Sequence, residues 1–172
     1  MTTTAHDIAA ELDLLTRHAP THIKLEITGG TRTWRLLPSL RHQKLIDRIR
    51  ASIAPIAASS VGCSCYHLSD PSLIFPDGSF KRPDIAIFCV EPPDIDESWD
   101  QVPEAVIEII SVGYEEKDLS INPLWYLSMG VKDVLVVDPH SGLVRHHRHG
   151  APVATHHQPK TVELLCGCRV VL

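Results

Sequence analysis

Two carboxylates in apolar surroundings are the residues of this 172-residue chain that are best placed to do chemistry. Asp84 lies in the segment RPDIAI (82–87), and Glu108 lies in the segment VIEIIS (106–111). Each apolar run has the length of a short strand, and two neighbouring strands would bring the acids together. A buried carboxylate is costly without a partner, and a divalent cation is a natural one. The pair predicts a metal site at the edge of a buried sheet.

Each acid also has an explanation without function. An aspartate that follows proline at the start of a strand often caps a turn, and an acid within a strand can lie on an exposed face. This explanation is preferred for Asp84 alone. It fits Glu108 less well, because the neighbours Val106 and Ile110 on the same face are apolar.

The composition is that of a compact domain with a sizeable core. With 44% hydrophobic and 22% charged residues, residues 1–172 are expected to form a single domain. No apolar run approaches the roughly 18 residues that cross a bilayer, and the opening residues lack a signal-peptide pattern. We therefore expect a cytoplasmic protein with no membrane partner. The net charge of -5 gives no global basic field, so any contact with DNA must be local.

The elements of the first half follow from changes in hydrophobic period. Residues 7–16 are predicted to form a short amphipathic helix. Alternation over residues 22–37, interrupted by Gly29 and Gly30, predicts a hairpin. Helical spacing returns from Leu40, with Ser39 as the cap, and continues to Pro55 or the small residues that follow it.

The second half is predicted to consist of short strands with one helical interruption. The expected strands span residues 61–68, 85–90, 105–110 and 134–137, and a short helix over residues 124–129 ends at Gly130. Residues 144–147 and 162–171 are expected to be late strands. Strands with flanking helices predict an α/β fold built on a mixed sheet.

Six segments, in their order, resemble the Uma-two family, the DUF820 group of restriction endonuclease-like proteins in the PD-(D/E)xK nuclease superfamily. They are LEITGG (25–30), the helix start PSLRH (38–42), the two acidic strands, the turn GVKDV (130–134) into LVVDP, and the closing VELLCGCRVVL. The resemblance covers nearly the whole chain. It implies an α/β restriction-endonuclease-like fold with a central mixed sheet flanked by helices.

The resemblance also implies a role for the two acids. Asp84 and Glu108 would bind Mg²⁺ or Mn²⁺, with the backbone carbonyl of Ile109 as the third ligand. Such a hard cation prefers oxygen ligands, lowers the pKa of a bound water and neutralises charge on a phosphate. Together with the resemblance, a shared metal site is the preferred interpretation of the pair.

The lysine of the superfamily motif is missing from both positions where the resemblance would place it. The residue two positions after the acid is Ile110. Family members take the lysine from the following helix, four residues after an aspartate that resembles Asp118, and that position is Asn122. An Asn-Pro pair is also a good helix start, so the substitution has a structural explanation. Lys117 or Lys44 is a candidate for the missing cation.

His42 is a further candidate for the site. The resemblance places the helix that starts near this residue beside the active-site cleft, where His42 could contact metal-bound water or phosphate. A lone helical histidine is more often a packed or solvent-facing residue. Tyr126 and Asp138 also match family positions, although Asp138 is expected to end a strand at a turn.

The cysteines and the other histidines are candidate ligands of a softer metal. Five cysteines in a chain without an export signal predict reduced thiols rather than a disulfide framework. Two C-x-C pairs would bind zinc if their strands were neighbours, but this spacing is shorter than usual, so buried cysteines are preferred. A solvated ribbon is preferred over a zinc or nickel site for the remaining group: His146, His147, His149, His156 and His157.

Two functions are therefore expected from the sequence. The first is a metal-dependent endonuclease that hydrolyses DNA phosphodiester bonds. The alternative is a catalytically impaired nuclease-fold protein that binds nucleic acid or a protein partner, since losing one transition-state donor typically costs about 100 to 1000-fold in rate. A homodimer is compatible with either function.

Overall fold

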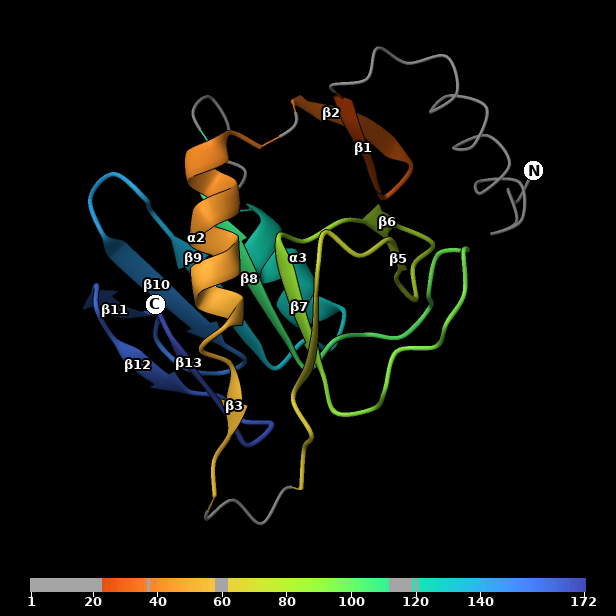
Figure 1. Cartoon of the computed structure of the whole chain (residues 1–172). Coiled ribbons are helices and arrows are strands. Elements are labelled where there is room, and N and C mark those ends of the chain that lie inside the picture. The colour runs from red at the N-terminus through yellow and green to blue at the C-terminus, as the bar shows by residue number, and fades with distance from the viewer. Residues whose placement is uncertain (1–22, 37, 58–61, 112–118, 120) are drawn as a thin grey trace.

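A six-stranded mixed sheet forms the centre of the computed structural model (Figure 1), which describes residues 23–36, 38–57, 62–111, 119 and 121–172. Its strand order is β11-β10-β9-β8-β7-β4. Strands β8 and β9 run parallel, and the other neighbouring pairs run antiparallel. The strands are β4 (Tyr66–Ser69), β7 (Ile85–Phe88), β8 (Ala105–Ile109), β9 (Asp133–Val137), β10 (Leu143–Arg148) and β11 (Ala154–His157).

Two smaller sheets and two helices complete the described part of the chain. A four-stranded sheet has the order β2-β1-β6-β5 and contains β1 (Ile23–Thr28), β2 (Thr31–Leu36), β5 (Leu73–Ile74) and β6 (Phe80–Lys81). A three-stranded sheet has the order β12-β13-β3 and contains β3 (Ala54–Pro55), β12 (Thr161–Glu163) and β13 (Cys168–Val171). The helices are α2 (Leu40–Arg50) and α3 (Asn122–Ser128), and no helix among the described residues is long and apolar enough to cross a membrane.

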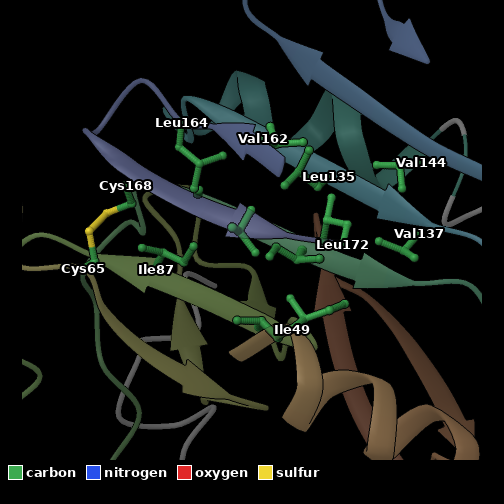
Figure 2. Close-up of a cluster of buried hydrophobic side chains, with 14 of the residues drawn as sticks. Ile49, Cys65, Ile87, Leu135, Val137, Val144, Val162, Leu164, Cys168 and Leu172 are labelled. Atoms are coloured by element: carbon green, nitrogen blue, oxygen red, sulfur yellow. A yellow bond between two sulfur atoms is a disulfide. The ribbon is translucent and has the colours of Figure 1, made fainter. Parts of the chain in front are cut away.

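Both faces of the central sheet are covered. One face packs against α2 and the C-terminal strands, and Figure 2 shows Leu135 and Val137 of β9 in this cluster with Val162 and with Ile49 of α2. The other face packs against α3, whose Tyr126 is fully buried among apolar residues of β7, β8 and β9. Burial on both faces explains why β7, β8 and β9 are continuous apolar runs rather than alternating ones. The predicted α/β fold with a mixed sheet and flanking helices is confirmed.

The predicted hairpin and the start of the main helix are confirmed, but the helix ends at Arg50, and Pro55, where it was expected to end, lies in β3. The hairpin β1–β2 turns at Gly29 and Gly30, whose φ angles of 53° and 80° favour glycine. Helix α2 starts after Ser39, whose hydroxyl accepts a hydrogen bond from the His42 N–H at 3.4 Å. The predicted helix over residues 7–16 lies outside the described residues.

Two predicted strands are shorter than expected. Residues 62–65 are irregular, because Gly62 and Cys65 adopt left-handed φ angles of 69° and 56°, and β4 begins only at Tyr66. The predicted strand over residues 162–171 is two strands, β12 and β13, which are separated by a turn at Gly167. Cys63 and Cys65 therefore lie in an irregular segment, and Cys166 lies in the turn before β13, which starts at Cys168, so neither pair shares one strand face and the prediction from a period of two is corrected.

The histidine-rich segment is not a fully solvated ribbon. Strands β10 and β11 pair antiparallel, but His146 and His147 are buried. His146 Nε2 lies 2.6 Å from Asp133 Oδ1 on the neighbouring strand. The sequence prediction was wrong for these two residues because β10 is an inner strand of the sheet rather than an edge.

Asp133 connects three segments of the fold. Its Oδ1 contacts His146 and accepts a hydrogen bond from Arg148 Nε, and its Oδ2 accepts one from the Leu165 N–H at 2.7 Å. The carboxylate itself is fully buried. It thus attaches the turn between β12 and β13 to the central sheet.

Replacing Asp133 with asparagine is expected to lower the free energy of unfolding by about 3 kcal/mol, because removing one member of a buried ionic network leaves its partners uncompensated. Urea denaturation at neutral pH measures this difference. The exposed loop residue Asp100 provides a matched control, and Asp100→Asn is expected to change stability by less than about 0.5 kcal/mol.

The stability difference between wild type and Asp133→Asn is expected to depend on pH. Burial by itself raises the pKa of Asp133, but the contacts with His146, Arg148 and Leu165 hold it below the ordinary value of 3.8. The folded pKa is therefore below the unfolded one, so this stabilisation is present above about pH 4 and is lost as the pH falls through the folded pKa. The stabilities of wild type and Asp133→Asn should converge below pH 4. An unchanged difference down to pH 2 would contradict this account.

Candidate active site

The two acids face each other because of the register between β7 and β8. These strands are antiparallel with Ile85 opposite Ile107, so Asp84, which directly precedes β7, stands opposite Glu108. The Asp84 N–H donates to Glu108 Oε2 at 3.4 Å, and the Ile109 N–H donates to Asp84 Oδ2 at 2.8 Å. The sequence prediction that neighbouring strands bring the two carboxylates together thus agrees with the geometry.

Both carboxylates are buried, and their surroundings stabilise the charged form of Asp84. Asp84 is 6% exposed and Glu108 is 1% exposed. Burial alone raises the pKa of Asp84, but the His42 imidazole, the Lys24 ammonium and the Ile109 N–H together hold that pKa below its usual value. Asp84 is therefore a carboxylate at neutral pH, which is the form that binds a cation.

His42 is brought to the site by the first turn of α2. Its Nε2 lies 3.1 Å from Asp84 Oδ2, and the residue is 7% exposed. The same nitrogen is buried and makes no well-aligned hydrogen bond with any residue that the structure describes. A water molecule held by a cation at Asp84 would give this nitrogen a partner.

Tyr126 fixes the orientation of Glu108 from the opposite side. Its hydroxyl donates to Glu108 Oε1 at 2.8 Å, and its ring packs in the apolar cluster under α3. The tyrosine thereby holds one oxygen of the carboxylate, while the backbone of Asp84 approaches the other. This match to a family position was noted in the sequence, but the contact itself was not predicted.

Lys81 is a buried cation that the sequence analysis missed. The side chain is fully buried, and its Nζ donates to Asn122 Oδ1 at 3.1 Å and lies 3.4 Å from Glu26 Oε2. The ammonium also lies 5.1 Å from the centre of the Trp125 ring, a favourable cation–π distance. An ammonium group is therefore present beside Asn122, the position where the family resemblance expects a lysine.

Strand pairing explains how Lys81 reaches this place. Strand β6 pairs antiparallel with β1, with Phe80 opposite Ile27, so Lys81 stands opposite Glu26. Residues 24–27 of β1 are all buried, so this strand is covered on both faces. Glu26, an acid flanked by the apolar residues Leu25 and Ile27, was the signal that could have indicated a buried partner.

The other lysine candidates lie elsewhere. Lys117 and Asp118 fall outside the described residues. Lys44 is exposed on α2, where it lines a groove with Arg41, Arg48 and Gln158. This groove is next to the turn of α2 that carries His42.

The donor set suits a hard divalent cation. Asp84 and Glu108 present carboxylate oxygens from adjacent strand ends, and buried His42 Nε2 is oriented toward Asp84. These residues could hold Mg²⁺ or Mn²⁺. The carbonyl of Ile109 as a third ligand stays a prediction, as do the catalytic roles of Asn122, Lys117 and His42.

The fold with its pair of acids at adjacent strand ends defines the class, a restriction-endonuclease-like α/β protein. A crystal structure of a "putative nuclease belonging to DUF820" from Anabaena variabilis has the same fold, with a TM-score of 0.64 and 18% sequence identity. The match covers 88% of this chain and 87% of that one.

Residues 10–167 match the family model Uma2, described as "Putative restriction endonuclease", and the chain belongs to this family. The resemblance to the Uma-two family is thereby confirmed. Among curated proteins, no match was found.

Proposed function

We propose that this protein is an endonuclease that hydrolyses DNA phosphodiester bonds with Mg²⁺ or Mn²⁺ bound by Asp84 and Glu108. The observation that carries the proposal is the position of Lys81 Nζ, 3.1 Å from Asn122 Oδ1. The ammonium that the family takes from the helix comes here from β6. The site then has both parts that the chemistry requires, a pair of acids for the cation and a positive charge for the phosphate.

Each residue of the site has a distinct task in this mechanism. A bound cation would lower the pKa of its water and neutralise negative charge on the phosphate. The Ile109 N–H orients Asp84, and the Tyr126 hydroxyl orients Glu108. Lys81 stabilises the charge that develops as the phosphate is attacked, and Asn122 holds its ammonium in place.

The basic side of α2 supports DNA as the substrate. Arg41, Lys44 and Arg48 line one groove, and the same helix carries His42 to Asp84. Phosphate contacts of this kind provide affinity without sequence specificity. They give a protein with a net charge of -5 the local positive surface that DNA binding needs.

Removing the metal tests the proposal. Supercoiled plasmid incubated with the protein and Mg²⁺ or Mn²⁺ should become nicked or linear, and excess EDTA should stop the reaction until metal is added back. Gel electrophoresis measures the forms. Cleavage that persists in EDTA would contradict a metal mechanism.

The alternative function, binding without cleavage, has its own outcome. A fluorescently labelled duplex would show binding by anisotropy, weakening with salt, while plasmid stays intact with either metal. That result would favour the catalytically impaired form. The single domain over residues 1–172, the cytoplasmic location and a homodimer stay predictions.

A further inference from the structure

All five cysteines of the chain gather at one place in the fold. Disulfides join Cys63 to Cys89 and Cys65 to Cys168, while Cys166 is a buried free thiol. The sequence predicted reduced thiols, whereas this structure holds two disulfides and one free thiol. The sequence analysis could not see this cluster, because it joins an irregular segment, the end of β7 and the turn between β12 and β13.

The sulfur atoms are close across the two disulfides as well as within them. The Sγ atoms of Cys63, Cys65 and Cys168 all lie within 4.8 Å of one another, and so do those of Cys63, Cys89 and Cys166. Cys63 Sγ lies 3.6 Å from Cys168 Sγ. Two ligands of a tetrahedral zinc site are about 3.8 Å apart, given a Zn–S bond of about 2.3 Å. The spacing between the two C-x-C pairs is thus the spacing of zinc ligands.

Each C-x-C pair contains or adjoins a residue with a left-handed backbone conformation. Cys65 adopts a left-handed φ of 56°, which is uncommon for a residue with a side chain, and Gly167 turns between Cys166 and Cys168 with a φ of 86°. The sulfurs of these two segments, which are far apart in sequence, both lie close to Cys63 Sγ. Within the described part of the chain, the side chains grouped closely enough to give one metal three ligands are cysteines.

We propose that the reduced protein binds one structural Zn²⁺ through Cys63, Cys65, Cys166 and Cys168. Cys63, Cys65 and Cys168 form one group of close sulfurs, and Cys166 is added as the fourth ligand because its sulfur is grouped with that of Cys63. Cys89 belongs to that second group as well, but it is half-buried and follows the end of β7, whereas these four cysteines are buried. Soft thiolates select zinc over the hard cations expected at Asp84. The zinc would fasten the turn between β12 and β13 to the segment that leads into β4, at the edge of the cluster where Figure 2 shows Cys65 and Cys168.

Zinc binding requires reduction of the disulfides first. A phosphine gives two electrons to each disulfide and becomes a phosphine oxide with oxygen from water, whose protons complete the four new thiols. Three of these, Cys63, Cys65 and Cys168, join the already free Cys166 as ligands. Zn²⁺ then binds four thiolates, and their protons are released. The cysteine cluster is separate from the site at Asp84 and Glu108. Asp84 and Cys89 lie at opposite ends of β7, about 16 Å apart along an extended strand.

Metal analysis of the full-length protein tests this proposal. After reduction with a phosphine and incubation with zinc, we expect about one zinc per chain after desalting, measured by elemental mass spectrometry. Cobalt(II) added instead should give the absorption of a tetrahedral thiolate complex. A control variant, Asp84→Ala, should keep the zinc, so this result is independent of the proposed nuclease site.

Cysteine variants sharpen the test. Cys168→Ser should reduce the bound zinc to less than about a tenth of the wild-type amount, because three ligands do not make a closed structural site. Cys89→Ser should keep it, and serves as the matched control. Zinc retained by Cys168→Ser, or lost from Cys89→Ser, would overturn the ligand set.

Counting thiols provides a second measurement that does not depend on folding of the variants. Cells are lysed in denaturant with a thiol-blocking reagent, and the blocked cysteines are counted by mass spectrometry. Five blocked cysteines per chain support the zinc site. A single blocked cysteine, Cys166, would show that the two disulfides exist in the cell and would rule out a zinc site there.

Discussion

Asp84→Asn and Glu108→Gln are each expected to reduce metal-dependent plasmid cleavage by about 1000-fold or more. A bound cation contributes several kcal/mol to the stabilisation of charge in the transition state, which corresponds to a factor of this size. Both replacements are nearly isosteric. Asparagine can still accept the Ile109 N–H, and glutamine can still accept the Tyr126 hydroxyl, so the loss reports on charge rather than on shape.

Binding of Mn²⁺, followed by calorimetry or by electron paramagnetic resonance, should weaken in parallel with cleavage. Asp100→Asn, in an exposed loop, is the control and should cleave and bind metal as wild type does. Thermal melting identifies any variant that fails to fold. Folded Asp84→Asn with more than a tenth of the wild-type rate would disprove the proposed ligand pair.

Lys81→Met is expected to slow cleavage by about 100 to 1000-fold while Mn²⁺ binding is retained, because one positive donor is lost from the transition state but both metal ligands remain. The decisive variant adds Asn122→Lys to Lys81→Met. It places a lysine at the family position, on α3, beside the space that the Lys81 side chain leaves. We expect this double variant to recover at least about tenfold of the lost rate.

Folding must be controlled in this comparison. Lys81 lies 3.4 Å from buried Glu26, and removing one side of such a pair costs about 3 kcal/mol or more. Lys81→Met/Glu26→Gln removes both charges and should restore stability without restoring cleavage. If Lys81→Met cleaves at the wild-type rate, Lys81 has no catalytic role and the cation must come from elsewhere.

Much of the fold could be predicted because it depends on local patterns. The hairpin at Gly29 and Gly30 follows from backbone freedom, and the start of α2 follows from the hydroxyl of Ser39. The runs that became β7, β8 and β9 are apolar throughout, which is typical of inner strands. The strand predicted over residues 61–68 was shorter, because Cys65 has a left-handed backbone that no apolar pattern reveals.

Some residues of the candidate site could be predicted from the sequence, and others could not. Asp84 and Glu108 could be chosen from the sequence, because each is an acid beside an apolar run and the motif of a known family surrounds them. Lys81 could not. It approaches Asn122 only because β6, two residues long, pairs with β1.

The family, the mixed α/β class and the choice of Asp84 and Glu108 as candidate ligands could be inferred from the amino-acid sequence. These depend on residue type and on spacing along the chain. The position of Lys81 beside Asn122, the contact of Asp133 with His146 and the cluster of five cysteines became visible once the chain was folded. Those contacts join segments that are distant along the chain, and their register depends on the packing of whole sheets, which no local pattern specifies.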